Sequence, residues 1–113
     1  MKKLLILGLL ILSLSLAPVP GIPTARAADT ANGAKIFQVH CAGCHPGGGN
    51  IIRRGKNLKK RALKRYKRDS LGAIASLVTK GKSPMSAYKD RLTAQEIEDV
   101  SAYVLEQAEK NWK

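Results

Sequence analysis

The chain has 113 residues, and 20 Lys or Arg against 8 Asp or Glu give it a formal net charge of +12. A chain of this length has room for one small domain, and such a domain often needs a cofactor or another staple to be stable. A net positive charge of this size indicates which partners the protein attracts, and it says little about the fold. Nucleic acid is excluded as a favoured partner, because only Tyr66 is interleaved with the most basic stretch and bases would find no stacking platform.

The first 27 residues have the pattern of a secretory signal peptide. A basic start precedes an apolar run over residues 4–16, and an A-x-A cleavage site ends at Ala27. The run is short for a membrane span, although an uncleaved anchor is the alternative. We therefore expect residues 1–27 to be removed and residues 28–113 to form one exported domain, in the thylakoid lumen or the periplasm. That domain keeps 17 of the 20 basic residues and all 8 acidic ones, a net charge of about +9.

The exported part opens with a helical pattern. We expect a helix over Asn32–Ala42, with Asp29 or Thr30 as its N-cap. Gly33 lies on the apolar face of this helix, where it would either let another helix cross closely or mark a frayed helix start.

Directly after this helix, residues 41–45 read C-x-x-C-H, the attachment pattern of a c-type haem. The thiols of Cys41 and Cys44 can add to the two vinyl groups of one haem, and His45 can place an imidazole on its iron. The alternatives are a disulfide, a thioredoxin-like dithiol and a zinc half-site. A thioredoxin-like dithiol needs a βαβ pattern, which we do not find. A structural zinc ion usually takes four ligands, and outside the motif the chain has no further Cys and only one His, His40. We therefore expect one covalent haem c with its iron.

Residues 46–50 are a glycine-rich loop by composition. Residues 53–68, here called the basic segment, then carry ten cations in sixteen residues and no acid: Arg53, Arg54, Lys56, Lys59, Lys60, Arg61, Lys64, Arg65, Lys67 and Arg68. Its apolar residues recur at helical spacing, so we expect a short helix over Leu58–Lys67 with Asn57 as its cap. Packing must hold this helix, because its like charges repel.

We interpret the basic segment as a docking surface for an acidic redox partner, since electrostatic steering speeds encounter. A solvated face that only keeps the protein soluble is one alternative. Loose attraction to anionic lipid is another, so membrane contact would be peripheral at most.

Two further helices are expected. One covers Leu71–Lys80 with Asp69 or Ser70 as its N-cap, and the last opens with a capping box at residues 93–96. A loop over residues 82–90 separates them. Because no stretch predicts a strand, the fold class is all-α, with about four helices around one haem.

Met85 is the only methionine after the expected cleavage site, and it lies in the loop between these two helices. A loop can bring a thioether to the far face of a haem, so we expect Met85 as the second axial ligand; the alternative is a core gap-filler. His40 neighbours Cys41 and is poorly placed to reach that face, so we expect an exposed or capping side chain. His/Met ligation fills both axial positions, which leaves outer-sphere one-electron transfer and favours the ferrous iron.

With these motifs the chain resembles the class I cytochromes c, and among them the cytochrome c6 (c553) group of cyanobacteria and algae. The resemblance covers nearly all of residues 28–113 and includes the C-x-x-C-H motif, the glycine loop with Asn50, the V-x-x-G-K-x-x-M run that ends at Met85, and residues 100–104 of the last helix. It implies a four-helix cytochrome c fold with His45 and Met85 as axial ligands. It also implies an electron carrier between a cytochrome b6f or bc-type complex and photosystem I or a terminal oxidase. We expect this carrier to be a monomer and not an enzyme.

Three departures from that group point to alternatives. Ser86 follows the methionine where the group often has Pro, and Leu77 replaces a Gln whose amide dipole helps to set the potential. The basic segment is also more basic than is usual there. A divergent, lower-potential c6-like protein with a redox-regulatory or other lumenal or periplasmic partner is therefore the alternative function. A weak haem peroxidase is a third, although the sequence offers no clear distal His or acid for peroxide.

Overall fold

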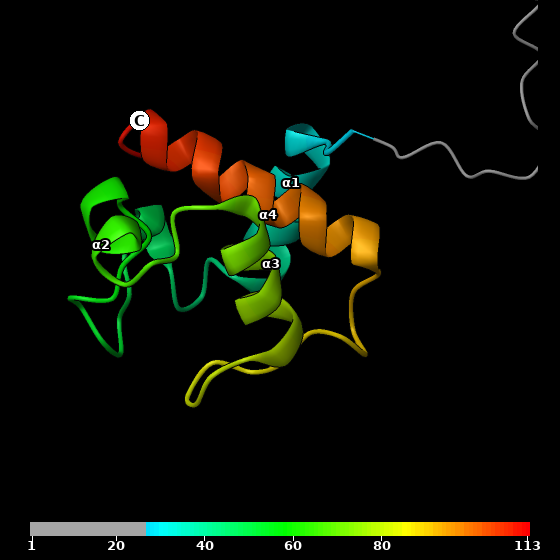
Figure 1. Ribbon diagram of the computed structural model, residues 1–113, viewed down its shortest axis with the longest axis horizontal. Helices are drawn as coiled ribbons and strands as arrows, with labels where there is room; N and C mark the ends of the chain where they lie inside the picture. The colour runs from blue at the N-terminus through cyan, green and yellow to red at the C-terminus, as the bar shows by residue number, and fades with distance from the viewer. Residues whose placement is uncertain (1–26) are drawn as a thin grey trace, which may run out of the picture.

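The computed structural model describes residues 27–113, and the expected signal peptide therefore lies, except for Ala27, outside the described residues. Four α-helices follow one another, α1 (Thr30–His40), α2 (Lys60–Arg65), α3 (Leu71–Lys80) and α4 (Ala94–Glu109), with a short 3₁₀ turn η1 (Pro46–Gly48) after α1 (Figure 1). In this part of the chain the only β-type pairing is one isolated bridge. The predicted all-α class is confirmed. None of the helices described is long and apolar enough to cross a membrane.

The well-capped helices lie where the sequence predicts them. α3 has the predicted bounds, and the Ser70 hydroxyl accepts a hydrogen bond from the N–H of Ala73 at 3.2 Å. The predicted capping box at the start of α4 is present, with Thr93 and Glu96 each bonded to the other's backbone N–H. α1 begins at Thr30 rather than Asn32, because Asp29 is the residue that caps it.

α2 is shorter than predicted, Lys60–Arg65 instead of Leu58–Lys67. Lys59 occupies its N-cap position and offers no side-chain oxygen to the first turn. The predicted cap, Asn57, instead accepts a hydrogen bond from the N–H of Lys59 at 3.0 Å, one residue before the helix. Without a cap, and with mutually repelling cations, only the turn with buried apolar side chains stays helical.

The crossing of α1 and α4 is the central contact of the fold (Figure 1). Gly33 is buried in α1 at this crossing, and a Cβ built there would collide with the carbonyl of Asp99 and lie 2.8 Å from the Cβ of Tyr103. Of the two uses that the sequence left open for Gly33, the close helix crossing is therefore the observed one.

A buried acid, which the sequence analysis did not identify, ties the start of α1 to α4. Asp99 accepts hydrogen bonds from the backbone N–H of Asp29, the amide of Asn32 and the amide of Gln95, each at 2.9 Å. Its side chain is almost fully buried, so these bonds replace the water that the carboxylate loses.

The C-terminal residues close the other end of the same helix pair. The Trp112 ring packs against Phe37 of α1 and Tyr103 of α4 at centroid distances of 5.2 and 6.0 Å, and its indole N–H donates to the carbonyl of Leu58 at 3.0 Å. Phe37 and Tyr103 also contact each other directly, at a centroid distance of 5.4 Å. No pattern in the sequence indicated the role of Trp112.

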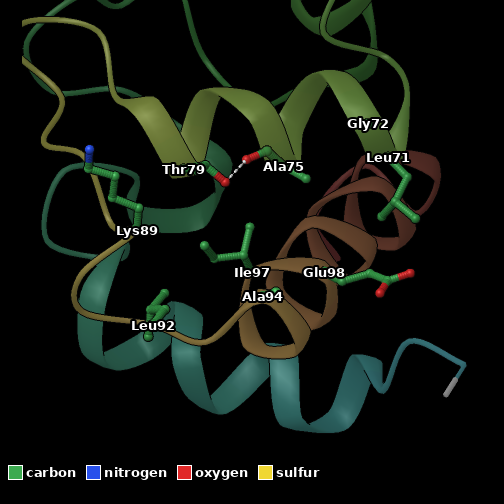
Figure 2. Close-up of a pocket in the computed structure, with 9 residues that line it drawn as sticks. All are labelled: Leu71, Gly72, Ala75, Thr79, Lys89, Leu92, Ala94, Ile97 and Glu98. Carbon is green, nitrogen blue, oxygen red and sulfur yellow. Dashed lines mark hydrogen bonds between the residues drawn. The ribbon is translucent and has the colours of Figure 1, made fainter. Parts of the chain in front are cut away.

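A hollow of about 460 Å³ lies between α3, α4 and the chain that joins them, on the side shown in Figure 2. Ile97 lies at its centre, and Lys89 and Glu98 lie at its two ends. No residue of the C-x-x-C-H motif lines it. It is a surface groove beside the core and separate from the site described next.

Candidate functional site

A second cavity, of about 320 Å³, lies between the end of α1, the basic segment and the loop after α3. Its wall includes all four residues expected to hold a haem: Cys41, Cys44, His45 and Met85. Most of the rest is apolar and comes from every α-helix of the described fold, including Phe37, Leu63, Ile74, Leu77, Val78, Val100 and Val104. The fold therefore gathers the predicted ligands, distant in sequence, around one largely apolar space.

The two cysteines lie at one side of this space and are not joined in a disulfide. Cys41 is half-buried and Cys44 is exposed. Burial, reinforced by the negative charge of a neighbouring Cys44 thiolate, raises the pKa of Cys41 to about 11. Before any bond to a vinyl group forms, Cys41 is therefore a neutral thiol at physiological pH.

The ring of His45 is oriented by its own loop. Its Nδ1 lies 2.8 Å from the carbonyl of Gly49; because a carbonyl only accepts, Nδ1 carries the proton and Nε2 keeps its lone pair for a metal. The 3₁₀ turn holds this carbonyl in place through a 2.9 Å bond from the N–H of Gly49 to Pro46. Gly47 and Gly48 have φ values of 58° and 79°, which explains the glycines that the sequence showed only as a loop.

Met85 reaches the cavity from a short, tight loop. Its backbone exchanges two hydrogen bonds with Lys82, at 2.8 and 3.1 Å, and Gly81 turns the chain with a φ of 67°. The loop is tied back to α3 by a 2.9 Å bond from the N–H of Tyr88 to the carbonyl of Val78. These bonds hold the half-buried thioether at the cavity wall.

His40 is not the exposed or capping side chain that the sequence predicted. It is half-buried, and its ring meets the ring of Tyr88 edge-on at a centroid distance of 5.9 Å. The hydroxyl of Tyr88 donates to the backbone carbonyl of His40 at 3.0 Å. The guanidinium of Arg91 lies over the Tyr88 ring, 4.4 Å from its centroid. His40 therefore anchors the methionine loop against the end of α1.

Asn50, which the sequence placed at the end of the glycine-rich loop, organises the turn that leads into the basic segment. Its side-chain oxygen accepts from the N–H groups of Ile52 and Arg53 at 3.0 and 2.8 Å, and its amide donates to the carbonyl of Lys56 at 2.9 Å. The signal available in the sequence was the Asn itself, a residue that favours such turns.

The cations of the basic segment do not form one uniform surface. Lys60 pairs with Glu109 at 2.9 Å on the exposed side. Arg53, Lys56 and Arg68 line the cavity. The remaining cations are exposed and line no part of it.

The residues present fit a covalent haem. Two free thiols, an imidazole with an available Nε2 and a thioether share one apolar cavity, which is the donor set of a His/Met c-type haem. The zinc half-site gains no support, because residues 27–113 contain no cluster of three or more His, Cys, Asp or Glu that could hold a metal ion.

Comparison with known proteins gives consistent matches. The family described as "Cytochrome C oxidase, cbb3-type, subunit III" matches residues 28–104. A "Cytochrome c6-like" protein of Nostoc sp. strain PCC 7120 is 67% identical over 91 residues, which cover 80% of this chain and 82% of the relative. A "Cytochrome c6" of the same strain is 47% identical over the full length of both chains. The crystal structure of cytochrome c6C from Synechococcus sp. PCC 7002 superposes with a TM-score of 0.68 and 59% identity, over 70% of this chain and 96% of that one.

Proposed function

The chain belongs to the cytochrome c6 family of mono-haem electron carriers with one covalent haem c, and from that premise we propose the roles of its residues, its compartment and its partners. The protein carries electrons from a cytochrome b6f or bc-type complex to photosystem I or a terminal oxidase. One observation carries the site assignment: both cysteines, His45 and Met85 line a single apolar cavity.

Each residue of the site has a separate task. Cys41 and Cys44 form the two thioether bonds, and His45 and Met85 are the axial ligands. The haem, when bound, supplies a one-electron couple between ferric and ferrous iron. If His45 and Met85 both hold the iron, no ligand position would remain for a substrate. The largely apolar wall would also limit the access of water to the haem, which favours an electron carrier over a peroxidase.

The proposal for the domains rests on the sequence pattern. Residues 1–27 are a cleaved signal peptide, and residues 28–113 act in the thylakoid lumen or the periplasm as a soluble monomer. The described residues are compatible with this division, since the first helix cap, Asp29, is the second residue after the expected cleavage site at Ala27.

A divergent carrier with a lower potential is the second candidate, and one observation favours it. Leu77 lines the cavity, so an apolar side chain occupies a wall position where an amide dipole would otherwise act on the haem. The lower-potential form would serve a redox-regulatory or other partner instead of photosystem I. The midpoint potential separates the two candidates directly.

The first test combines an optical redox titration with carbon monoxide binding. We expect the holoprotein to be low-spin and not to bind carbon monoxide when ferrous. Met85→Ala should open one axial position and bind carbon monoxide. Its equilibrium constant for reduction of the haem, here called the reduction constant, should fall tenfold or more, since the thioether favours ferrous iron. Ala87→Ser, in the same loop but outside the cavity wall, should behave as wild type. A purified chain without covalent haem, or carbon monoxide binding by the wild type equal to that of Met85→Ala, would contradict the assignment.

A further inference from the structure

Arg68 differs from every other cation of the basic segment. Its side chain is half-buried and lines the haem cavity, whereas Arg53 and Lys56, which also line that cavity, are exposed. Within residues 27–113 no carboxylate lies within 4.0 Å of the Arg68 guanidinium. Arg68 therefore carries a permanent charge at the wall of an apolar space without an ion-pair partner from the described chain.

The backbone is built to bring Arg68 there. α2 ends with Lys67 in the left-handed region at a φ of 56°. The N–H of Arg68 donates to the carbonyl of Leu63 at 2.7 Å, and the N–H of Lys67 donates to the carbonyl of Lys64 at 3.2 Å. These two bonds form a Schellman motif, which stops the helix and reverses the chain. Residue 68 thus leaves the basic face of α2 and joins the cavity wall.

A guanidinium at an apolar wall needs an anion of matching shape, because desolvating an unpaired charge is costly and arginine pairs well with carboxylates. A haem that fills this cavity brings two propionate carboxylates with it. We propose that Arg68 binds a haem propionate and that its charge, held beside the haem, favours the reduced state. The inference rests on the haem site proposed above.

The expected effect has a definite sign. Reduction adds one negative charge to the haem group, and a nearby fixed cation stabilises the state that carries it. Removing the cation should therefore lower the reduction constant, by about tenfold, which is about 59 mV for a one-electron couple. This is opposite in direction to the effect expected from Leu77, so the two residues would partly offset each other.

The test is the midpoint potential of three holoprotein variants, with resonance Raman spectra of the propionate bending bands as a second measurement. Arg68→Met should lower the reduction constant about tenfold and shift those bands. Arg68→Lys keeps the charge and should lose less than threefold. Lys35→Met removes an equal charge from an exposed position on α1 outside the cavity wall, and should change the constant less than twofold.

The readouts distinguish this inference from the haem assignment. Covalent haem is measured independently by mass and absorbance, and its absence from the wild type would overturn both proposals. Haem-loaded Arg68→Met with the potential and Raman bands of the Lys35→Met control would overturn the propionate contact alone. If Arg68→Met does not accumulate as holoprotein, Arg68→Lys and the Raman spectra of the wild type still decide: propionate bands of the free-carboxylate type in the wild type overturn the proposal.

Discussion

Lys67 holds the left-handed position that ends α2, with a φ of 56°, where helices usually place glycine. A side chain with a Cβ is disfavoured in this conformation, so the native state stores strain at this residue. The sequence shows only another lysine in a basic run, and it predicted that the helix continued through position 67. The backbone conformation of Lys67 thus explains why the predicted helix extended too far at its C-terminal end.

We expect Lys67→Gly to raise the free energy of unfolding by about 0.5–1 kcal/mol, because glycine adopts a positive φ without strain. Denaturant unfolding of the holoprotein measures the change. Lys64→Gly, inside the same helix, is the control and should cost about 1 kcal/mol, because glycine is a poor interior helix residue. Equal losses for both variants would show that position 67 carries no strain.

The site residues divide at this scale into those visible in the sequence and those that are not. Cys41, Cys44 and His45 stand in a local motif, and Met85 became a candidate ligand because no other methionine follows the expected signal peptide. The cavity position of Arg68 had no local signal, since it depends on a turn and on packing of the chain after it.

At the scale of elements, the crossing of α1 over α4 depends on the missing side chain of Gly33. The nearest atoms belong to the backbone and the Cβ of α4, which cannot rotate away. The helix pair has to separate if a methyl group is added. Since α1 leads directly into the C-x-x-C-H motif, such a shift would also move the cysteines.

We expect Gly33→Ala to lower the free energy of unfolding by about 2–3 kcal/mol through overpacking. Gly72→Ala is a matched control on α3, because a Cβ there meets nothing within 4 Å. That variant should gain about 0.5–1 kcal/mol from helix propensity. Thermal or denaturant unfolding of the two holoproteins measures both changes, and a stable Gly33→Ala would mean that the helices can repack.

Side-chain N-caps explain which helices could be located correctly from the sequence. α3 and α4 begin at side chains that bond their own first turn, so their starts are local properties. α2 has no such cap and exists because Ala62 and Leu63 are buried in the assembled fold. Its length was therefore mispredicted.

At the scale of the whole molecule, the exposed part of the basic segment is the surface proposed to meet an acidic redox partner. Lys60 is already paired with Glu109, and Arg68 belongs to the cavity, so neither is the best probe of docking. Lys59, Arg61 and Lys64 are exposed, line no part of the cavity and form no ion pair within the described residues.

We expect the triple variant Lys59→Glu, Arg61→Glu, Lys64→Glu to slow the association with photosystem I about tenfold or more at low salt, and less as salt screens the charges. Flash-induced absorbance changes give the second-order rate. Lys35→Glu, Lys80→Glu, Lys113→Glu makes the same change in net charge outside the basic segment and should slow association much less. Equal rates for the two triple variants at every ionic strength would remove the docking role of this segment.

The sequence by itself determined the chemistry and the class of this protein. A covalent haem needs two thiols and a histidine at fixed spacing, and that spacing is a property of neighbouring residues. Helix caps and apolar periodicity are local as well, which is why the starts of α3 and α4 were predicted well. Only the tertiary structure decided the close crossing at Gly33, the buried Asp99 clamp, the packing of Trp112 and the cavity position of Arg68. Each of these depends on contacts between residues far apart in the chain, and no local pattern records such contacts.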